Sequence, residues 1–94
     1  MGSQNSASVK PHHIKIPGSY IIRKNIDGVW KEQYANITNQ SSENHYEYEY
    51  GIVGYHEGNC KLEQIRELTS QEKQLEASGQ TFKLPQQFYQ SVNV

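Results

Sequence analysis

The chain has almost none of the residues that cross-link small domains. Its 94 residues include one cysteine, Cys60, so no disulfide can form within the chain. No Cys–His spacing typical of a structural zinc site is present either. A protein with a single thiol suits a reducing compartment, and we therefore expect a cytoplasmic location.

Apolar residues are also scarce, at 34% of the chain. No run is long enough to span a membrane, and residues 1–13 lack the apolar core of a signal peptide. These thirteen residues are small and polar apart from Met1 and Val9, which predicts a flexible N-terminal tail. Residues 14–94 then form a single small domain with a thin core, in which the seven tyrosines and one tryptophan supply much of the buried area.

Charge is nearly balanced but unevenly distributed. The net charge of −1 does not favour non-specific binding to nucleic acid. Residues 1–34 carry five basic and two acidic side chains, a balance of +3, whereas residues 43–76 carry eight glutamates and three basic side chains, a balance of −5. The two halves can be complementary faces of one fold, or a charge dipole that orients a partner or a second copy.

The clearest structural signal is a hairpin over residues 19–35. The four residues from Asn25 to Gly28 suit a type I turn closed by a left-handed glycine, which is a bulged three-residue loop. This loop predicts Lys24 opposite Trp30 and one face shared by Tyr20, Ile22, Trp30 and Tyr34. A two-residue Asp-Gly loop would instead pair Lys24 with Lys31 and move Trp30 off that face. Pattern and charge both favour the bulged loop.

Strict alternation marks a further strand over residues 45–50, continuing through Ile52. It would place Tyr46, Tyr48 and Tyr50 on one face, with Glu47 and Glu49 on the other. Residues 36–44 before this strand are polar and predict a loop, and residues 57–59 after it predict a turn.

Residues 60–79 allow two interpretations. The preferred one is a strand over 60–67 and a helix over 70–78, because Thr69 to Glu72 form a capping box and Gly79 suits a helix stop. The alternative is one continuous helix. The expected fold is therefore α+β: an antiparallel meander of three to four strands with one C-terminal helix packed on it. Residues 82–94 carry aromatic side chains around Pro85 that can dock on the sheet or on a partner.

Catalytic chemistry finds little support. Cys60 could be a nucleophile with His56 as its base, but no third orienting group or oxyanion motif accompanies them. Glu47 and Glu49 alternate with tyrosines, so they are most simply the solvent side of a half-buried strand. The four histidines do not converge at a spacing suited to a metal. We expect no enzyme activity, no metal and no cofactor.

The tyrosines of residues 46–50 can be buried in the core, on the sheet face that the helix covers, or they can be exposed and form an interface. Bases could stack on such a face, but proteins that bind RNA this way surround their aromatics with cations rather than glutamates. We therefore expect a small non-enzymatic module that binds another protein, with a homodimer as a further expectation. The candidate partner-binding residues are Tyr46, Tyr48, Tyr50, Phe82, Phe88 and Tyr89. The alternative is a nucleic-acid-associated factor using Lys10, Lys15, Arg23, Lys24 and Lys31.

Overall fold

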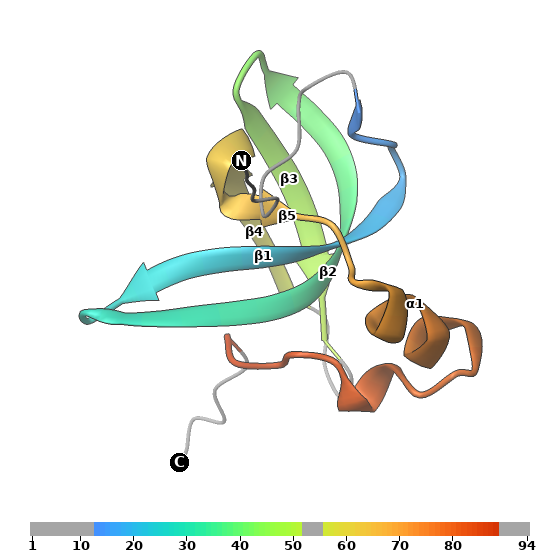
Figure 1. Cartoon of the computed structure of the whole chain (residues 1–94). Coiled ribbons are helices and arrows are strands. Elements are labelled where there is room, and N and C mark those ends of the chain that lie inside the picture. Colours follow the sequence, from blue (N-terminus) through green and yellow to red (C-terminus); the bar gives the residue numbers. More distant parts are fainter. Residues whose placement is uncertain (1–12, 52–55, 89–94) are drawn as a thin grey trace, which may run out of the picture.

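The computed structural model describes residues 13–51 and 56–88 (Figure 1). In these ranges five strands form one antiparallel sheet in the order β4-β3-β2-β1-β5. The α+β prediction is confirmed, with a meander-like sheet of five strands and one short C-terminal helix. The elements are β1 (Gly18–Ile26), β2 (Val29–Ser42), β3 (His45–Tyr50), β4 (His56–Lys61), the 3-10 turn η2 (Leu62–Gln64), β5 (Ile65–Arg66), α1 (Ser70–Ala77) and the 3-10 turn η3 (Thr81–Lys83).

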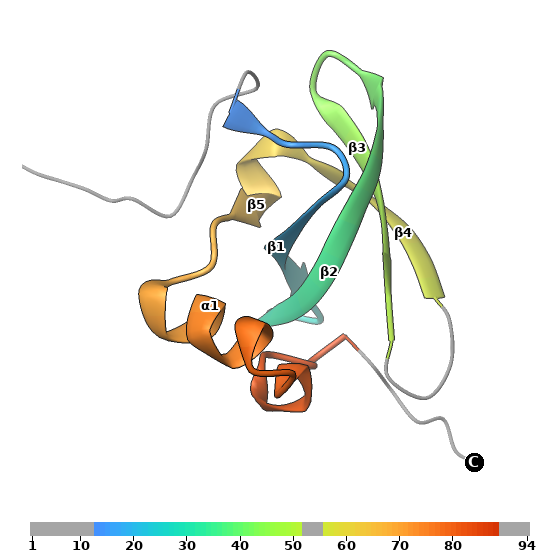
Figure 2. The same cartoon turned by 90° about the vertical axis from the view of Figure 1, so that its right-hand side faces the viewer.

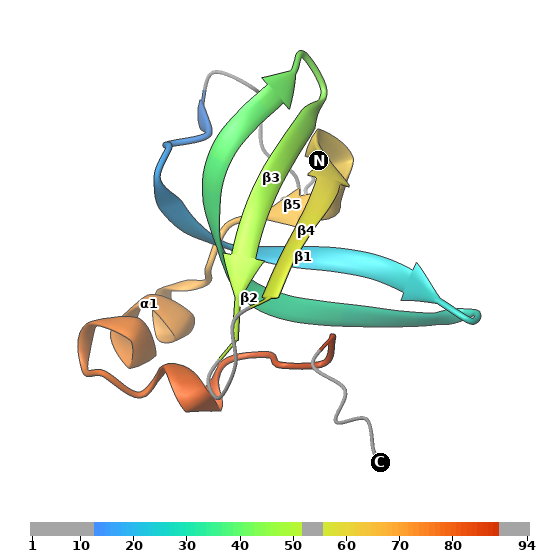
Figure 3. The ribbon, with the colours of Figure 1, turned by 180° about the vertical axis from the view of Figure 1, so that it is seen from behind.

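The length of β2 shapes the sheet, because β2 pairs with β1 through its first half and with β3 through its second. β3 and β4 consequently cross the β1–β2 pair at a steep angle (Figure 3). The main core lies between these two parts of the sheet. Its buried residues are Tyr20, Ile22, Ala35, Ile37, Tyr46, Tyr48, Cys60, Ile65 and Phe88.

A second, smaller core lies on the opposite face of β1. It contains Ile21, Leu68 and Leu84, with Tyr34 and Leu75 packed against them. Covering both faces of β1 explains its consecutive buried residues, 20–22, since neighbours in a strand point to opposite sides. The second core also closes the end of the sheet where the chain turns into α1.

The helix α1 begins at the predicted residue and ends at Ala77, one residue before the predicted end. Thr69 Oγ1 accepts a hydrogen bond from the Glu72 N–H, and the Glu72 carboxylate accepts one from the Thr69 N–H. Gly79 follows with φ of 79°. Figure 2 shows α1 next to η3, to one side of β1 and β2. Within residues 13–51 and 56–88, no helix has the length and apolar character needed to cross a membrane.

The predicted hairpin register is wrong. Asp27 and Gly28 have φ of 54° and 82°, so they form a two-residue loop with Ile26 opposite Val29 and Lys24 opposite Lys31. Aspartate adopts the left-handed conformation at modest cost, so Asp-Gly supplies both positive φ angles that such a loop needs. The register carries Trp30 and Tyr34 to the face opposite Tyr20 and Ile22. The Lys24 amine lies over the rings of Tyr48 and Phe88, so this lysine makes cation–π contacts on the core face.

Three further segments differ from expectation. Residues 36–42 are not a loop but the second half of β2, in which residues 38–42 are exposed and the pairing with β3 shifts register at 37–39 and 40–42. Residues 57–59 lie inside β4 rather than in a turn. Residues 60–67 are neither one strand nor a helix, because the Gln64 side chain accepts a hydrogen bond from the Lys61 N–H and turns the chain between β4 and β5. Ile52 and residues 1–12 of the predicted tail lie outside the described residues.

Candidate functional site

The hairpin of β1 and β2 extends past the strands beside it. β5 pairs with β1 only at Ile21 and Ile22, and β3 pairs with β2 only from Asn36 onward. Residues 23–31, which we call the arm, project from the rest of the molecule at the left of Figure 1. The arm carries two large exposed apolar residues, Val29 and Trp30, and Trp30 is 63% exposed.

A short extended segment, residues 84–88, runs along β2 beside the arm. The Tyr34 N–H donates to the Pro85 C=O at 2.8 Å, and the Gln87 N–H donates to the Glu32 C=O at 2.9 Å. Buried Gln33 adds a side-chain bond of 3.0 Å from its Nε2 to Gln86 Oε1. Leu84 and Phe88, at the two ends of the segment, are buried in the second and the main core. These contacts fix the segment as an extra strand whose pairing stops at Glu32.

A groove of about 640 Å³ lies between the arm and this segment. Trp30 forms one wall, and the Arg23 guanidinium lies 5.7 Å from the centre of its ring, a cation–π contact. This contact favours one position of the exposed ring at the wall of the groove. The lining residues are Arg23, Trp30, Glu32, Glu72, Lys83, Leu84, Pro85, Gln86 and Gln87.

Arg66 neutralises the acidic side chains of the groove. Its guanidinium donates two hydrogen bonds to Glu32 and two to Glu72, all between 2.9 and 3.1 Å, and a fifth to the Glu67 C=O. These bonds raise the pKa of Arg66, and the bond from Arg66 is the largest cause of a lowered pKa at Glu72. Lys83 has no ion pair with any residue that the structure describes. Arg23 touches Glu32 only at 3.4 Å, so the charge left to the groove is positive.

The structure does not gather the predicted aromatic residues into one surface. Tyr46 and Tyr48 are buried, so they form a core floor, although this floor lies between the two parts of the sheet rather than beneath α1. Tyr50 is half-buried and stacks on His56, with the edge of Phe88 against it. Of the six candidates, Phe88 is also a core residue, Phe82 is 60% exposed on η3, and Tyr89 lies outside the described residues.

Sequence reasoning missed Trp30 as a site residue because the bulged loop placed it with Tyr20 and Ile22. The Asp-Gly pair, which is the strongest short signal for a two-residue loop, could have found it. With that loop, Trp30 moves to the opposite face and beyond the reach of the main core.

The Cys60–His56 pair is not assembled. Both residues lie on β4 four positions apart, which is about 13 Å along a strand. Cys60 is buried in the main core, and burial raises the pKa of its thiol to about 11. The thiol is therefore held in its protonated form at neutral pH, as an apolar filler would be.

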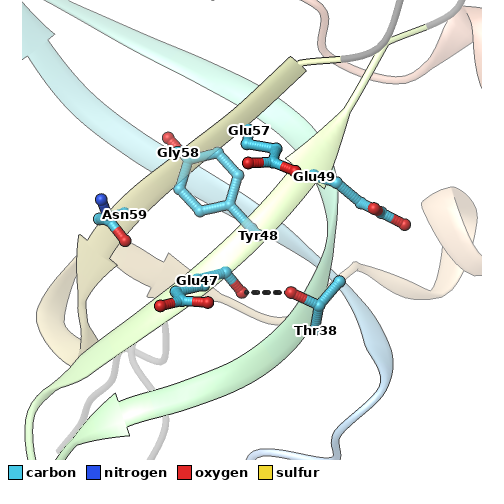
Figure 4. A pocket seen from close by; sticks show the side chains of 7 residues that line it. All are labelled: Thr38, Glu47, Tyr48, Glu49, Glu57, Gly58 and Asn59. Atoms are coloured by element: carbon cyan, nitrogen blue, oxygen red, sulfur yellow. Dashed lines mark hydrogen bonds between the residues drawn. The ribbon is translucent and has the colours of Figure 1, made fainter.

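A second hollow, of about 360 Å³, lies on the outer side of β3 and β4 (Figure 4). Glu47 and Glu49 line it from the solvent side of β3, as the alternation predicts, and Glu57 faces them from β4. Thr38 Oγ1 donates to the Glu47 C=O at 3.4 Å. In the described part of the chain, no three His, Cys, Asp or Glu side chains are grouped so as to hold a metal ion.

Comparison with known proteins yields no match: no family model, no curated protein sequence and no solved structure matches this chain. Function is therefore inferred from the geometry. The groove beside the arm combines an exposed indole, two cations and a strand edge, whereas the outer hollow presents a set of acidic and polar side chains. The groove is the better candidate site.

Proposed function

We propose that this chain is a non-enzymatic protein-interaction module that binds another protein through the groove between the arm and residues 84–88. The observation that carries the proposal is the position of Trp30, which is exposed on a paired strand and held by Arg23. Tryptophan and arginine dominate the binding energy of protein interfaces, particularly when they are already ordered before the partner arrives.

The surroundings of Trp30 support a preformed site. The Arg66 network fixes the floor of the groove, and backbone hydrogen bonds fix its far wall at Pro85 and Gln87. Binding would therefore order few additional side chains. A groove that is already shaped loses less entropy on binding than a flexible one.

The nucleic-acid alternative gains no specific observation. Of its five basic residues, Arg23 contacts Glu32, Lys24 lies over core rings, and Lys10 is outside the described residues. Burial is also the largest cause of a lowered pKa at Lys24. A cytoplasmic location stays a prediction.

Affinity capture from the source organism tests the proposal. We expect the immobilised chain to retain a protein that Trp30→Ala retains at least about tenfold less well, which corresponds to about 1.4 kcal/mol or more. Phe82→Ala is the matched control, because it removes an exposed aromatic ring on η3 instead of the arm. Retention that depends on Phe82, or on neither ring, contradicts a site at the groove. Amide spectra of both variants establish that they are folded.

A further inference from the structure

The hydrogen bonds of β2 reveal which of its backbone groups face the groove side. The Tyr34 N–H and the Glu32 C=O both bond to residues 85–87, on the side away from β1. In an antiparallel pair, successive residues direct their N–H and C=O groups to opposite sides of the strand. The backbone N–H and C=O groups of Lys31 and Gln33 therefore point toward β1. Those of Trp30 point away from β1, like those of Glu32 and Tyr34.

The line of hydrogen bonds on this side stops before it reaches the arm. Gln87 is bonded to Glu32, and no residue in the described ranges makes a hydrogen bond to the backbone N–H or C=O of Trp30. Among the described residues, the backbone N–H and C=O of Trp30 therefore have no partner at the strand edge beside the exposed ring. Such an edge is a ready template for one more extended strand.

We infer that the partner of this module binds as an extended acidic segment that adds to the edge of β2 at Trp30, continuing the line begun by residues 85–87. This inference rests on the proposed function and names the kind of partner. Backbone hydrogen bonds to Trp30 would supply affinity, and alternate side chains of the segment would enter the groove.

The charge of the groove determines the chemistry of those side chains. Glu32 and Glu72 both pair with Arg66, whereas Lys83 has no ion pair in the described part of the chain and Arg23 has one, at 3.4 Å. Carboxylates on the groove face of the added segment would meet these two cations. A basic segment would meet the same cations and be repelled.

Amide hydrogen exchange in the full-length chain at low micromolar concentration tests whether the edge is open. We expect the Trp30 amide to exchange at least about tenfold faster than those of Lys31 and Gln33, which face β1. Equal protection of all three would show that the chain covers its own edge, and protection that appears only at high concentration would show a second copy there. Either result overturns a partner segment as the occupant.

A peptide titration tests the addition itself. The probe is a blocked hexapeptide of alternating Glu and Val, followed through the amide shift of Trp30 and the fluorescence of this single tryptophan. Strand addition uses the N–H groups of alternate residues. The unmodified peptide is compared with two N-methylated versions, one methylated on its Glu amides and the other on its Val amides. We expect one of these two versions to bind at least about tenfold more weakly than the unmodified peptide. Equal binding of all three peptides, or no shift at Trp30, overturns the inference.

Two further comparisons test the acidic preference. A matched peptide of alternating Lys and Val should bind at least several-fold more weakly, and Lys83→Ala should reduce this difference. Lys73→Ala, on the exposed side of α1, is the control and should leave it unchanged. Equal binding of acidic and basic peptides overturns the inference. If the captured protein still requires the Trp30 ring in that case, the groove function stands and only strand addition fails.

Discussion

Asp27 decides the register of the first hairpin through its backbone conformation. Its φ of 54°, followed by 82° at Gly28, closes the loop in two residues. One additional loop residue would slip one strand by one position and exchange the faces of all its side chains. The exposure of Trp30, and with it the groove, therefore depends on a conformation that most side chains resist.

Substitution of Asp27 distinguishes the two loops. Asp27→Ala should lower the free energy of unfolding by about 1 kcal/mol, since alanine disfavours positive φ, and Asp27→Asn should change it little. In a bulged loop the same position has negative φ and tolerates alanine. Denaturant titration measures both variants, and an unchanged midpoint for Asp27→Ala would contradict the two-residue loop. Gly28→Val should cost at least about 1 kcal/mol with either loop.

Arg66 links elements that are distant in sequence, since it joins β5 to β2 and α1 through Glu32 and Glu72. Its side chain is only 15% exposed, so losing the guanidinium leaves two carboxylates poorly compensated. We expect Arg66→Gln to cost about 2–4 kcal/mol. Arg66→Lys should cost less but not nothing, because an ammonium lacks the planar fork that makes two hydrogen bonds to each carboxylate.

Arg23→Gln is the matched control for Arg66. The Arg23 side chain is 39% exposed and has one ion pair at 3.4 Å, so its loss should change stability by less than about 1 kcal/mol. Urea unfolding of Arg66→Gln, Arg66→Lys and Arg23→Gln measures whether their costs in stability decrease in this order. Equal costs for Arg23→Gln and Arg66→Gln would contradict the bridging role of Arg66.

Glu72 makes the Arg66 contact between β5 and α1 sensitive to acid. Its pKa is lowered from an ordinary value of 4.5, first by the hydrogen bond from Arg66. A lowered pKa in the folded state contributes stability that is fully present above the ordinary value and is lost as pH falls through the folded value. Stability should therefore decrease below about pH 4.5, and Glu72→Gln should flatten part of this decrease. An unchanged acid slope would contradict the assignment, and Glu63→Gln, at an exposed carboxylate, is the control.

Elements with a local signal are the ones that sequence reasoning predicted correctly. The period of two predicts β3, and the capping box and Gly79 delimit α1. The second half of β2 was not predicted because its residues 38–42 are polar and exposed. A strand without alternating apolar residues has the same sequence pattern as a loop. The groove could not be predicted, because it requires the contact between Gln33 and Gln86, which are 53 positions apart.

Residues 84–88 are expected to be essential for folding. Truncation after Gly79 removes Leu84 and Phe88 from the two cores and leaves Glu32 and Tyr34 without their backbone partners. Burying a Leu and a Phe side chain contributes roughly 3–6 kcal/mol together, a large part of the stability of a small domain. Thermal unfolding should show no cooperative transition. A cooperative, stable truncated domain would show that the segment is dispensable.

At the scale of the whole molecule, the thin core and the exposed apolar side chains motivate the expectation of a weak homodimer. Phe82 is exposed and can anchor such a contact, whereas Phe88 belongs to the core. Phe82→Ala should weaken a contact through η3 by about 1–3 kcal/mol, and a contact through the outer edge of β4 would tolerate it. Sedimentation equilibrium separates the cases, and a monomer at high micromolar concentration contradicts the dimer. A dimer through either surface leaves the Trp30 edge open.

The order of the elements along the chain has a consequence for synthesis. All five strands precede residues 84–88, which contribute Phe88 to the main core, Leu84 to the second core and the far wall of the groove. A chain emerging from the ribosome therefore exposes the sheet with both cores incomplete, which favours late completion of the fold. The groove does not exist until this segment has emerged. A partner that requires it can bind the completed domain and not the growing chain.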